Sequence, residues 1–127
     1  MAQATTKNLA TLPFGRLGLI PLKSCETLGD KVDQWLVKWR SERSHSELDS
    51  VAFEGYQRDS YKISASIPRF GSGEGKCTIS ESVRGDDLYL MVDVCNYSIS
   101  YPIGQYTNFM SPDDHFQDLK RAIAAIG

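Results

Sequence analysis

Apolar residues in the first third of the chain predict a strand followed by an amphipathic helix. The apolar run Leu17–Leu22 is short and contains a proline near its end, which is typical of a buried strand. Downstream, apolar side chains recur at helical spacing and form one face, with Ser24 as the predicted N-cap and Glu26 in the first turn. The members of this face are Leu28, Val32, Trp35, Leu36 and Trp39.

The middle of the chain predicts strands. Residues 61–67 alternate between apolar and polar, as in a half-buried strand that ends at Pro68. A second short alternation places Cys77 and Ile79 inward, so that Gly71–Gly75 becomes the turn of a hairpin. The nearly continuous apolar run Asp87–Val94 predicts a strand of a parallel sheet, covered on both faces.

The last third predicts a long connection and a helix. Tyr97–Met110 is polar and aromatic, and we expect a connection without regular structure. Ser111 is the predicted cap of a helix that has Pro112 in its first turn and Asp114 in a capping box, and Gly127 ends it. The predicted inner stripe of this helix is Phe116, Leu119, Ile123 and Ile126.

The order strand, helix, hairpin, strand, helix predicts one α/β domain over residues 1–127, with residues 1–14 expected to be flexible. A crossover helix normally leads into another parallel strand, so we expect the sequence to be cut after its last helix. The sheet edge left open by such a cut predicts self-association.

Composition narrows the class of protein. The chain has 127 residues, of which 41% are hydrophobic and 24% charged, and its net charge is −2. These values are ordinary for a soluble globular domain and argue against strong nonspecific nucleic-acid binding. The chain has no apolar run long enough to span a bilayer, and its start lacks a signal-peptide core. Three cysteines without a C-x-x-C pair favour a reducing, cytoplasmic location.

The glycine-rich stretch Arg69–Lys76 is the strongest candidate for binding chemistry. It is not a Walker A loop, because Phe70 replaces its first glycine and Cys77 replaces its Ser/Thr. It also lacks the third glycine of the dinucleotide fingerprint. One interpretation is a simple turn. The other is a purine pocket, in which Phe70 offers a stacking face, Glu74 an acceptor and Ser72 a hydroxyl.

Four other features have a structural and a chemical interpretation. Asp113, Asp114 and His115 resemble a metal site, but a helix start explains both aspartates. Cys95 could be a nucleophile, although a packed thiol is favoured because no general base is evident. His45 is expected at the surface. Ser82–Asp87 is expected to be a turn, with Arg84 as a candidate anion ligand.

The stretch "RFGSGEGKCTISESVRGDDLYLMVDVC" resembles the N-terminal domain of ribose-phosphate pyrophosphokinase, also called phosphoribosyl pyrophosphate synthetase. That family shows an Arg/Lys-Phe-Ser-Asp/Asn-x-Glu loop, then E-S/N-V-R-G-x-D and a hydrophobic strand. The helix start "DDHFQDL" also fits the family's order. The resemblance covers Arg69–Cys95 and Ser111–Gly127, and more loosely Leu17–Arg43. Tyr97–Met110 and Ser44–Tyr61 are longer than the family's corresponding segments.

The resemblance implies half of a three-layer α/β/α phosphoribosyltransferase-like fold with a mostly parallel sheet and a hairpin. It implies transfer of a diphosphoryl group from ATP to ribose 5-phosphate with Mg²⁺, by a homo-oligomer. Phe70 would stack on adenine and Glu74 would accept from its amino group, in a neighbouring subunit's active site. Ser72 stands where the family has Asp or Asn. Ser82 and Arg84 would lie near a subunit interface and a phosphate regulatory site.

The family's catalytic and metal-binding loops lie further along its chain. The resemblance therefore implies no catalytic or metal-binding residue within these 127 residues, and we expect this chain alone to be inactive. Two alternatives remain open at this point. One is a noncatalytic regulatory or scaffold homologue that associates with catalytic subunits, and the other is an unrelated α/β binding domain whose glycine loop is only a turn.

Overall fold

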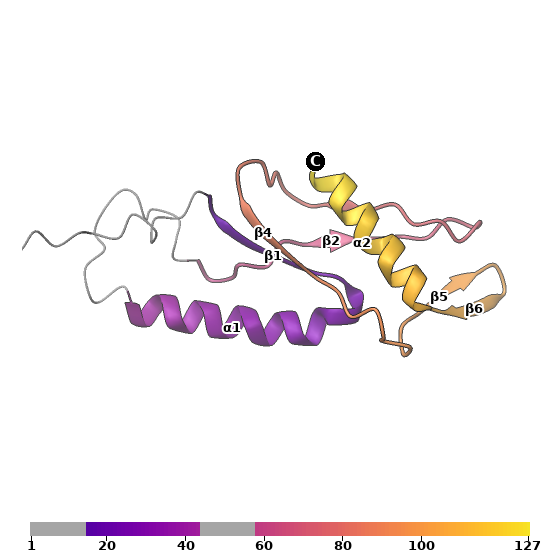
Figure 1. Ribbon diagram of the computed structural model, residues 1–127, viewed down its shortest axis with the longest axis horizontal. Helices are drawn as coiled ribbons and strands as arrows, with labels where there is room; N and C mark the ends of the chain where they lie inside the picture. The colour runs from indigo at the N-terminus through magenta and orange to yellow at the C-terminus, as the bar shows by residue number, and fades with distance from the viewer. Residues whose placement is uncertain (1–14, 44–57) are drawn as a thin grey trace, which may run out of the picture.

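A computed structural model describes residues 15–43 and 58–127 as a mixed α/β structure (Figure 1). His45, the expected flexible start and most of the Ser44–Tyr61 expansion lie outside the described residues. The elements, in chain order, are β1 (Leu17–Pro21), the short 3-10 helix η2 (Lys23–Cys25), α1 (Glu26–Arg43), β2 (Ala65–Ser66), β3 (Thr78–Ile79), β4 (Asp87–Met91), β5 (Ser100–Ile103), β6 (Tyr106–Phe109) and α2 (Pro112–Ile126).

The parallel pairing predicted for the apolar strands is confirmed, but the prediction of a mostly parallel sheet is wrong. The described strands form three two-stranded sheets, of which only β1–β4 is parallel. β1 and β4 pair in parallel, with Leu19 opposite Tyr89, and a single bridge joins Leu19 to Lys62 on the other side of β1. The prediction that β4 is covered on both faces is wrong. Leu88 and Leu90 pack toward the core, whereas Tyr89 is 62% exposed, and the strand ends at Met91 rather than Val94. An apolar run can form a strand with only one covered face when its alternate residue is an amphipathic tyrosine.

The predicted first helix is present, but its start differs from the prediction. Ser24 is not an N-cap, because it lies inside η2 and its hydroxyl accepts a hydrogen bond from the Asp93 backbone N–H at 3.0 Å. Ser24 therefore ties the end of β1 to the residues after β4. α1 packs on β1 through Gly29, whose Cα approaches the Pro21 ring so closely that an added Cβ would lie 2.5 Å from it.

Asp33 is the buried polar residue of α1. Its carboxylate accepts the Tyr61 backbone N–H at 2.6 Å and the Ser60 hydroxyl at 2.8 Å. The neighbouring Asp30 forms an ion pair with Lys62. These contacts hold one flank of α1 against the segment that follows residue 57. The apolar face predicted for this helix is only partly buried. Val32 and Leu36 are half-buried, while Leu28, Trp35 and Trp39 are exposed.

We predict that Gly29→Ala destabilises the protein by about 1–3 kcal/mol, because the new methyl group overlaps the Pro21 ring. In an isolated helix the same change would stabilise by up to about 1 kcal/mol. Chemical denaturation measures the change in the free energy of unfolding. The control is Gln34→Ala, at an exposed position of the same helix. A stabilised Gly29→Ala variant would show that α1 and β1 do not meet at this point.

The hairpin predicted around the glycine loop is confirmed. β2 and β3 are antiparallel, with Ala65 opposite Ile79, and a further bridge joins Arg69 to Gly75. The predicted alternation also holds, since Tyr61 and Ile63 are buried while Lys62 and Ser64 are exposed.

The prediction of an unstructured Tyr97–Met110 connection is wrong. β5 and β6 form a second antiparallel hairpin, with Ser100 opposite Phe109 and Ile103 opposite Tyr106. Its two-residue turn begins at Gly104, which has φ of +58°. Glycine with positive φ at the first turn position is the requirement of a II′ hairpin turn. The signal was present in the sequence as Gly104-Gln105 between two short alternating runs.

The start and end of α2 agree with the prediction. The Ser111 hydroxyl accepts the Asp114 backbone N–H, the Asp114 carboxylate accepts the Ser111 N–H, and Gly127 caps the end through a bond to the Ile123 carbonyl. The predicted inner stripe is wrong in part. Phe116 and Ile123 are exposed. The residues that α2 buries instead are His115, Asp118 and Ala122, with Leu119 and Ile126 half-buried.

The core lies between α2 and the strands. Ile20, Leu22, Ile63 and Ala122 are fully or almost fully buried together, and Leu88 and Leu90 of β4 pack against them. Because alternate residues of a strand point to opposite faces, Ile20 faces α2 while Pro21 faces Gly29 of α1. The two helices therefore pack on opposite sides of β1 (Figure 1).

Candidate functional site

The glycine loop forms the tight turn of the β2–β3 hairpin. The Phe70 backbone N–H donates to the Glu74 carbonyl at 2.8 Å, and the Gly73 N–H donates to the Phe70 carbonyl at 2.9 Å. Gly73 has φ of +90°, a conformation that glycine adopts without strain. The three residues Gly71–Gly73 therefore reverse the chain.

The turn presents the three residues predicted to bind adenine. Phe70 and Glu74 are joined across the hairpin by a backbone hydrogen bond, and their side chains are both exposed. Phe70 is 55% exposed. Ser72 is exposed at the tip. The arrangement places an aromatic face, a carboxylate and a hydroxyl on one short turn, where a flat ring with hydrogen-bonding edges can be bound.

A buried ion pair anchors the base of this turn. The Arg69 guanidinium donates to the Asp118 carboxylate of α2 at 2.6 Å, and the Arg69 side chain is only 8% exposed. The same guanidinium lies over the Tyr101 ring of β5, 4.4 Å from its centre. Arg121 also donates to Asp118, at 2.9 Å. Because Arg69 precedes Phe70 directly, α2 and β5 hold the base of the turn in place.

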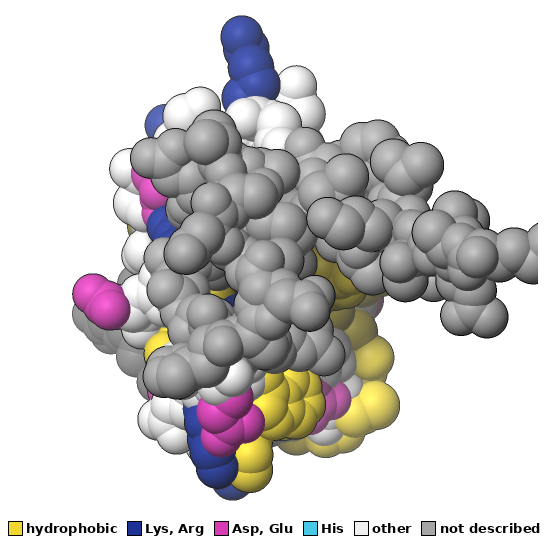
Figure 2. Space-filling model, turned by 90° about the vertical axis from the view of Figure 1, so that its left-hand side faces the viewer, with side chains coloured by type: hydrophobic (Ala, Val, Ile, Leu, Met, Phe, Trp, Pro, Cys, Tyr) yellow, Lys and Arg dark blue, Asp and Glu magenta, His cyan; other side chains and the backbone are white. Residues whose placement is uncertain are grey.

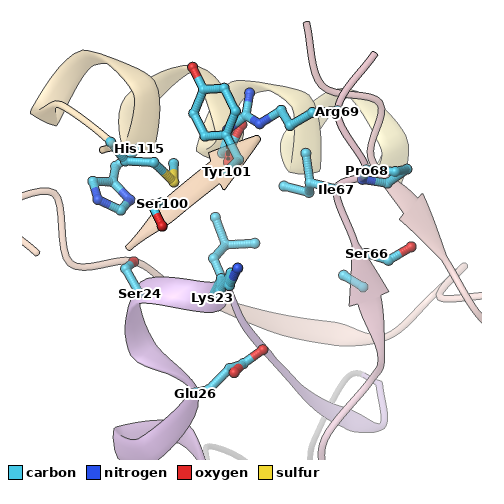
Figure 3. A pocket seen from close by; sticks show the side chains of 14 residues that line it. Lys23, Ser24, Glu26, Ser66, Ile67, Pro68, Arg69, Ser100, Tyr101 and His115 are labelled. Carbon is cyan, nitrogen blue, oxygen red and sulfur yellow. Dashed lines mark hydrogen bonds and ion pairs between the residues drawn. The ribbon is translucent and has the colours of Figure 1, made fainter. Parts of the chain in front are cut away.

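A cavity of about 410 Å³ adjoins the anchor (Figure 3). It lies beyond the carboxyl end of β1, where open α/β sheets commonly bind ligands. Its walls come from η2 and the start of α1, from β2 and the residues after it, from β5 and from α2. The polar and charged lining residues are Lys23, Ser24, Glu26, Ser66, Arg69, Ser100, Tyr101, His115 and Asp118, and Leu22, Ile67 and Met110 supply much of the apolar surface.

Partly buried hydrogen bonds fix the α2 side of this cavity. The His115 Nε2 lies 2.8 Å from the Asn96 carbonyl, and the ring is almost fully buried. The Tyr101 hydroxyl donates to Asp114 at 3.3 Å. Burial by itself would raise the pKa of Asp114, but hydrogen bonds from the Ser111 backbone and hydroxyl, and from Tyr101, hold that pKa below its usual value. Asp114 thus remains ionised and stabilises the start of α2.

The other predicted anion-binding residues lie at a separate place. Ser82–Asp87 is a turn as predicted, with Gly85 at φ of +81° and Asp86 N–H bonded to the Val83 carbonyl at 3.1 Å. Ser82 and Arg84 are exposed and line a shallow depression, together with Lys76 and the last residues of α2. The structure therefore groups Phe70, Ser72 and Glu74 on one turn, and Ser82 and Arg84 on another.

The structure also locates Cys95, Cys77 and the acidic side chains. Cys95 is exposed, so its prediction as a packed thiol is wrong: the chain has left β4 before reaching it. Cys77 is half-buried, and burial followed by the nearby Asp118 carboxylate raises its pKa, which disfavours the nucleophilic thiolate. Within residues 15–43 and 58–127, no group of three His, Cys, Asp or Glu side chains could hold a metal ion.

Comparisons with protein-family models, with curated protein sequences and with solved structures each yield no match. Among the described helices, none has the length and apolar character required to cross a bilayer.

Sequence reasoning missed the cavity and its anchor. Asp118 and His115 were not predicted to be buried, because the apolar residues of α2 suggested a different inner face. Tyr101 fell in the segment expected to lack structure. The only available signal was the hairpin pattern on either side of Gly104, which would have placed Tyr101 on a strand.

Proposed function

We propose that this chain supplies the adenine-contacting loop and a subunit interface to a ribose-phosphate diphosphokinase. This enzyme transfers the β,γ-diphosphoryl group of ATP to O1 of ribose 5-phosphate. The observation that carries the proposal is the exposed Phe70 ring beside Glu74, on a turn whose base is anchored by the Arg69–Asp118 ion pair.

The chemistry of adenine fits this turn. Its flat ring can stack on Phe70, an interaction worth about 1–3 kcal/mol for a base on an aromatic side chain. Its exocyclic amino group donates hydrogen bonds, and the exposed Glu74 carboxylate only accepts them. Ser72 can add one hydrogen bond to the same edge. The loop would complete its pocket with a neighbouring subunit, which accounts for its projection from the fold.

The proposal includes half of a three-layer phosphoribosyltransferase-like fold. Two observations support it: β1 and β4 are parallel, and α1 and α2 pack on opposite sides of β1. The second turn would bind a phosphate-like anion. Arg84 and Lys76 supply two positive charges to the shallow depression there, Ser82 supplies a hydroxyl, and Glu81 adds one negative charge.

The proposal assigns no catalytic residue and no Mg²⁺ ligand to this chain, since the resemblance implies that those loops lie further along the family's chain. A noncatalytic module that assembles with catalytic subunits is the second candidate. The exposed apolar side chains of α1 favour it, because such residues mark contact surfaces. The two candidates differ at the loop, since a module without a nucleotide role would bind ATP no more weakly after Phe70 is removed.

We predict that Ser72→Asn tightens ATP binding about fivefold or more, since an amide can both donate to and accept from the adenine edge. No residue other than glycine has a positive φ among the described residues, so asparagine fits the turn without strain. Fluorescence titration with ATP and with inorganic tripolyphosphate measures the effect. Ser80→Asn, at an exposed serine outside the turn, is the matched control. Equal tightening toward tripolyphosphate would contradict adenine recognition.

A further inference from the structure

The cavity beside Arg69 takes no part in the proposed adenine contact. None of Phe70, Ser72 and Glu74 is among its lining residues. Its volume of about 410 Å³ lies in the lower part of the range of about 300–1,000 Å³ that is typical of small-molecule pockets. Figure 2 views the molecule from the end where α1 finishes, and hydrophobic side chains lie beside charged ones there. The cavity lies toward the other end, between the starts of α1 and α2 (Figure 1), and is a separate candidate binding site.

The inner wall of the cavity is apolar. Leu22, which follows β1, and Met110, which precedes the cap of α2, both line the cavity and are each only 5% exposed. Ile67 and the ring of Tyr101 extend this wall (Figure 3). An apolar group that leaves water for such a surface stabilises a complex. A ligand of this cavity is therefore expected to place an apolar group inside it.

The charged and polar groups on the α2 side of the cavity already have partners within the chain. The Arg69 guanidinium donates to the Asp118 carboxylate, which also accepts from Arg121. The Nε2 of His115 lies 2.8 Å from the Asn96 carbonyl, and a carbonyl can only accept, so Nε2 carries the proton. These groups balance one another without a ligand. The charged groups of a ligand are therefore expected to bind elsewhere on the cavity.

Lys23 and Glu26 supply two opposite charges on the other side of the cavity. They lie three residues apart where η2 leads into α1, a spacing that brings two side chains to the same side of a helical turn. Figure 3 shows both of them across the cavity from Tyr101. Both are exposed, and among the described residues neither forms an ion pair. Lys62 also interacts electrostatically with Glu26, but its ammonium is paired with Asp30.

We propose that this cavity binds a free α-amino acid with a large apolar side chain. Lys23 would bind the α-carboxylate and Glu26 the α-ammonium, while the side chain packs on Leu22 and Met110. A free amino acid carries both charged groups on one carbon, which suits two residues of one turn, whereas the end of a peptide carries only one of them. The lining is neutral, since Lys23 and Arg69 balance Glu26 and Asp118, and a zwitterion keeps it so. The proposal does not depend on nucleotide binding.

Nuclear magnetic resonance on the 127-residue chain with methyl-labelled methionine tests the proposal. At least one of L-leucine, L-methionine and L-phenylalanine should shift the Met110 methyl resonance, with a dissociation constant below about 1 mM. The Met91 methyl, which is not part of the cavity lining, should move far less. The N-acetyl and amide derivatives of the same amino acid each lack one charge and should bind about threefold or more weakly. No shift at about 5 mM of any of the three, or equal binding of both derivatives, would overturn the proposal.

Two variants test which charge binds which group. Lys23→Gln should weaken amino-acid binding about threefold or more and bind the amide derivative as well as the amino acid, because the contact to the carboxylate is gone. Glu26→Gln should do the same with the N-acetyl derivative. Lys31→Gln, at an exposed lysine of α1 outside the cavity lining, is the matched control and should bind like the wild type. All three side chains are exposed, so each variant is expected to fold. Wild-type affinity and selectivity in Lys23→Gln and Glu26→Gln would overturn the proposal.

Discussion

Asp118→Ala is expected to lower the free energy of unfolding by about 3–5 kcal/mol, which would make it the most destabilising single change in this site. The reason is that Arg69 would remain buried without its carboxylate partner. Its side chain is 8% exposed, and Asp118 is the one acid that pairs with it among the described residues. Arg121 would lose the same partner. Urea denaturation followed by circular dichroism measures the change.

An exposed ion pair provides the control for this prediction. Asp30 pairs with Lys62 at the surface, where both side chains are at least one third exposed. Asp30→Ala should therefore destabilise by less than about 1 kcal/mol. Equal losses in the two variants would mean that Arg69 reaches solvent when Asp118 is removed. The base of the turn would then not be anchored as described.

Phe70→Ala is expected to weaken ATP binding about 5- to 150-fold, which corresponds to the loss of about 1–3 kcal/mol of stacking. The fold should be unaffected, because the ring is more than half exposed. Competition between ATP, adenosine and tripolyphosphate in a fluorescence titration measures the change. Adenosine should compete with ATP, and tripolyphosphate should compete far less.

Phe116→Ala is the matched control, since Phe116 is a similarly exposed phenylalanine on α2, outside the glycine turn. Its removal should leave ATP affinity unchanged. If both variants lost affinity alike, the effect would reflect general loss of apolar surface. If neither did, adenine would not stack on Phe70, and the noncatalytic module would become the better account of the chain.

Local patterns were sufficient to predict several elements. The alternation from Tyr61 to Ile67, followed by glycines, predicted the β2–β3 hairpin because strand period and turn chemistry are both local properties. The capping residues Ser111 and Asp114 predicted the start of α2 for the same reason. The candidate binding residues Phe70, Ser72 and Glu74 followed from that turn and from the family resemblance; all three are exposed, and their binding role stays a prediction.

Long-range packing decided what local patterns could not. The inner face of α2 is set by the ion pair between Arg69 and Asp118, which lie 49 residues apart in the sequence. The apolar stripe of α2 was therefore a poor guide to which of its residues are buried. Similarly, α1 packs against β1 through Gly29 and against Tyr61 through Asp33, and not through its tryptophans. The cavity beside Arg69 draws on four separate parts of the chain, and no single stretch of sequence carries its pattern.

Adenine contact by the glycine turn is tested most directly by nuclear magnetic resonance on the chain with ring-labelled phenylalanine. With ATP at about 10 mM, which detects binding as weak as the millimolar range, we expect nuclear Overhauser effects between the adenine protons and the Phe70 ring. Tripolyphosphate at the same concentration should leave the resonances of residues 70–75 unchanged. Adenine contacts confined to residues outside the glycine turn would contradict the proposed function.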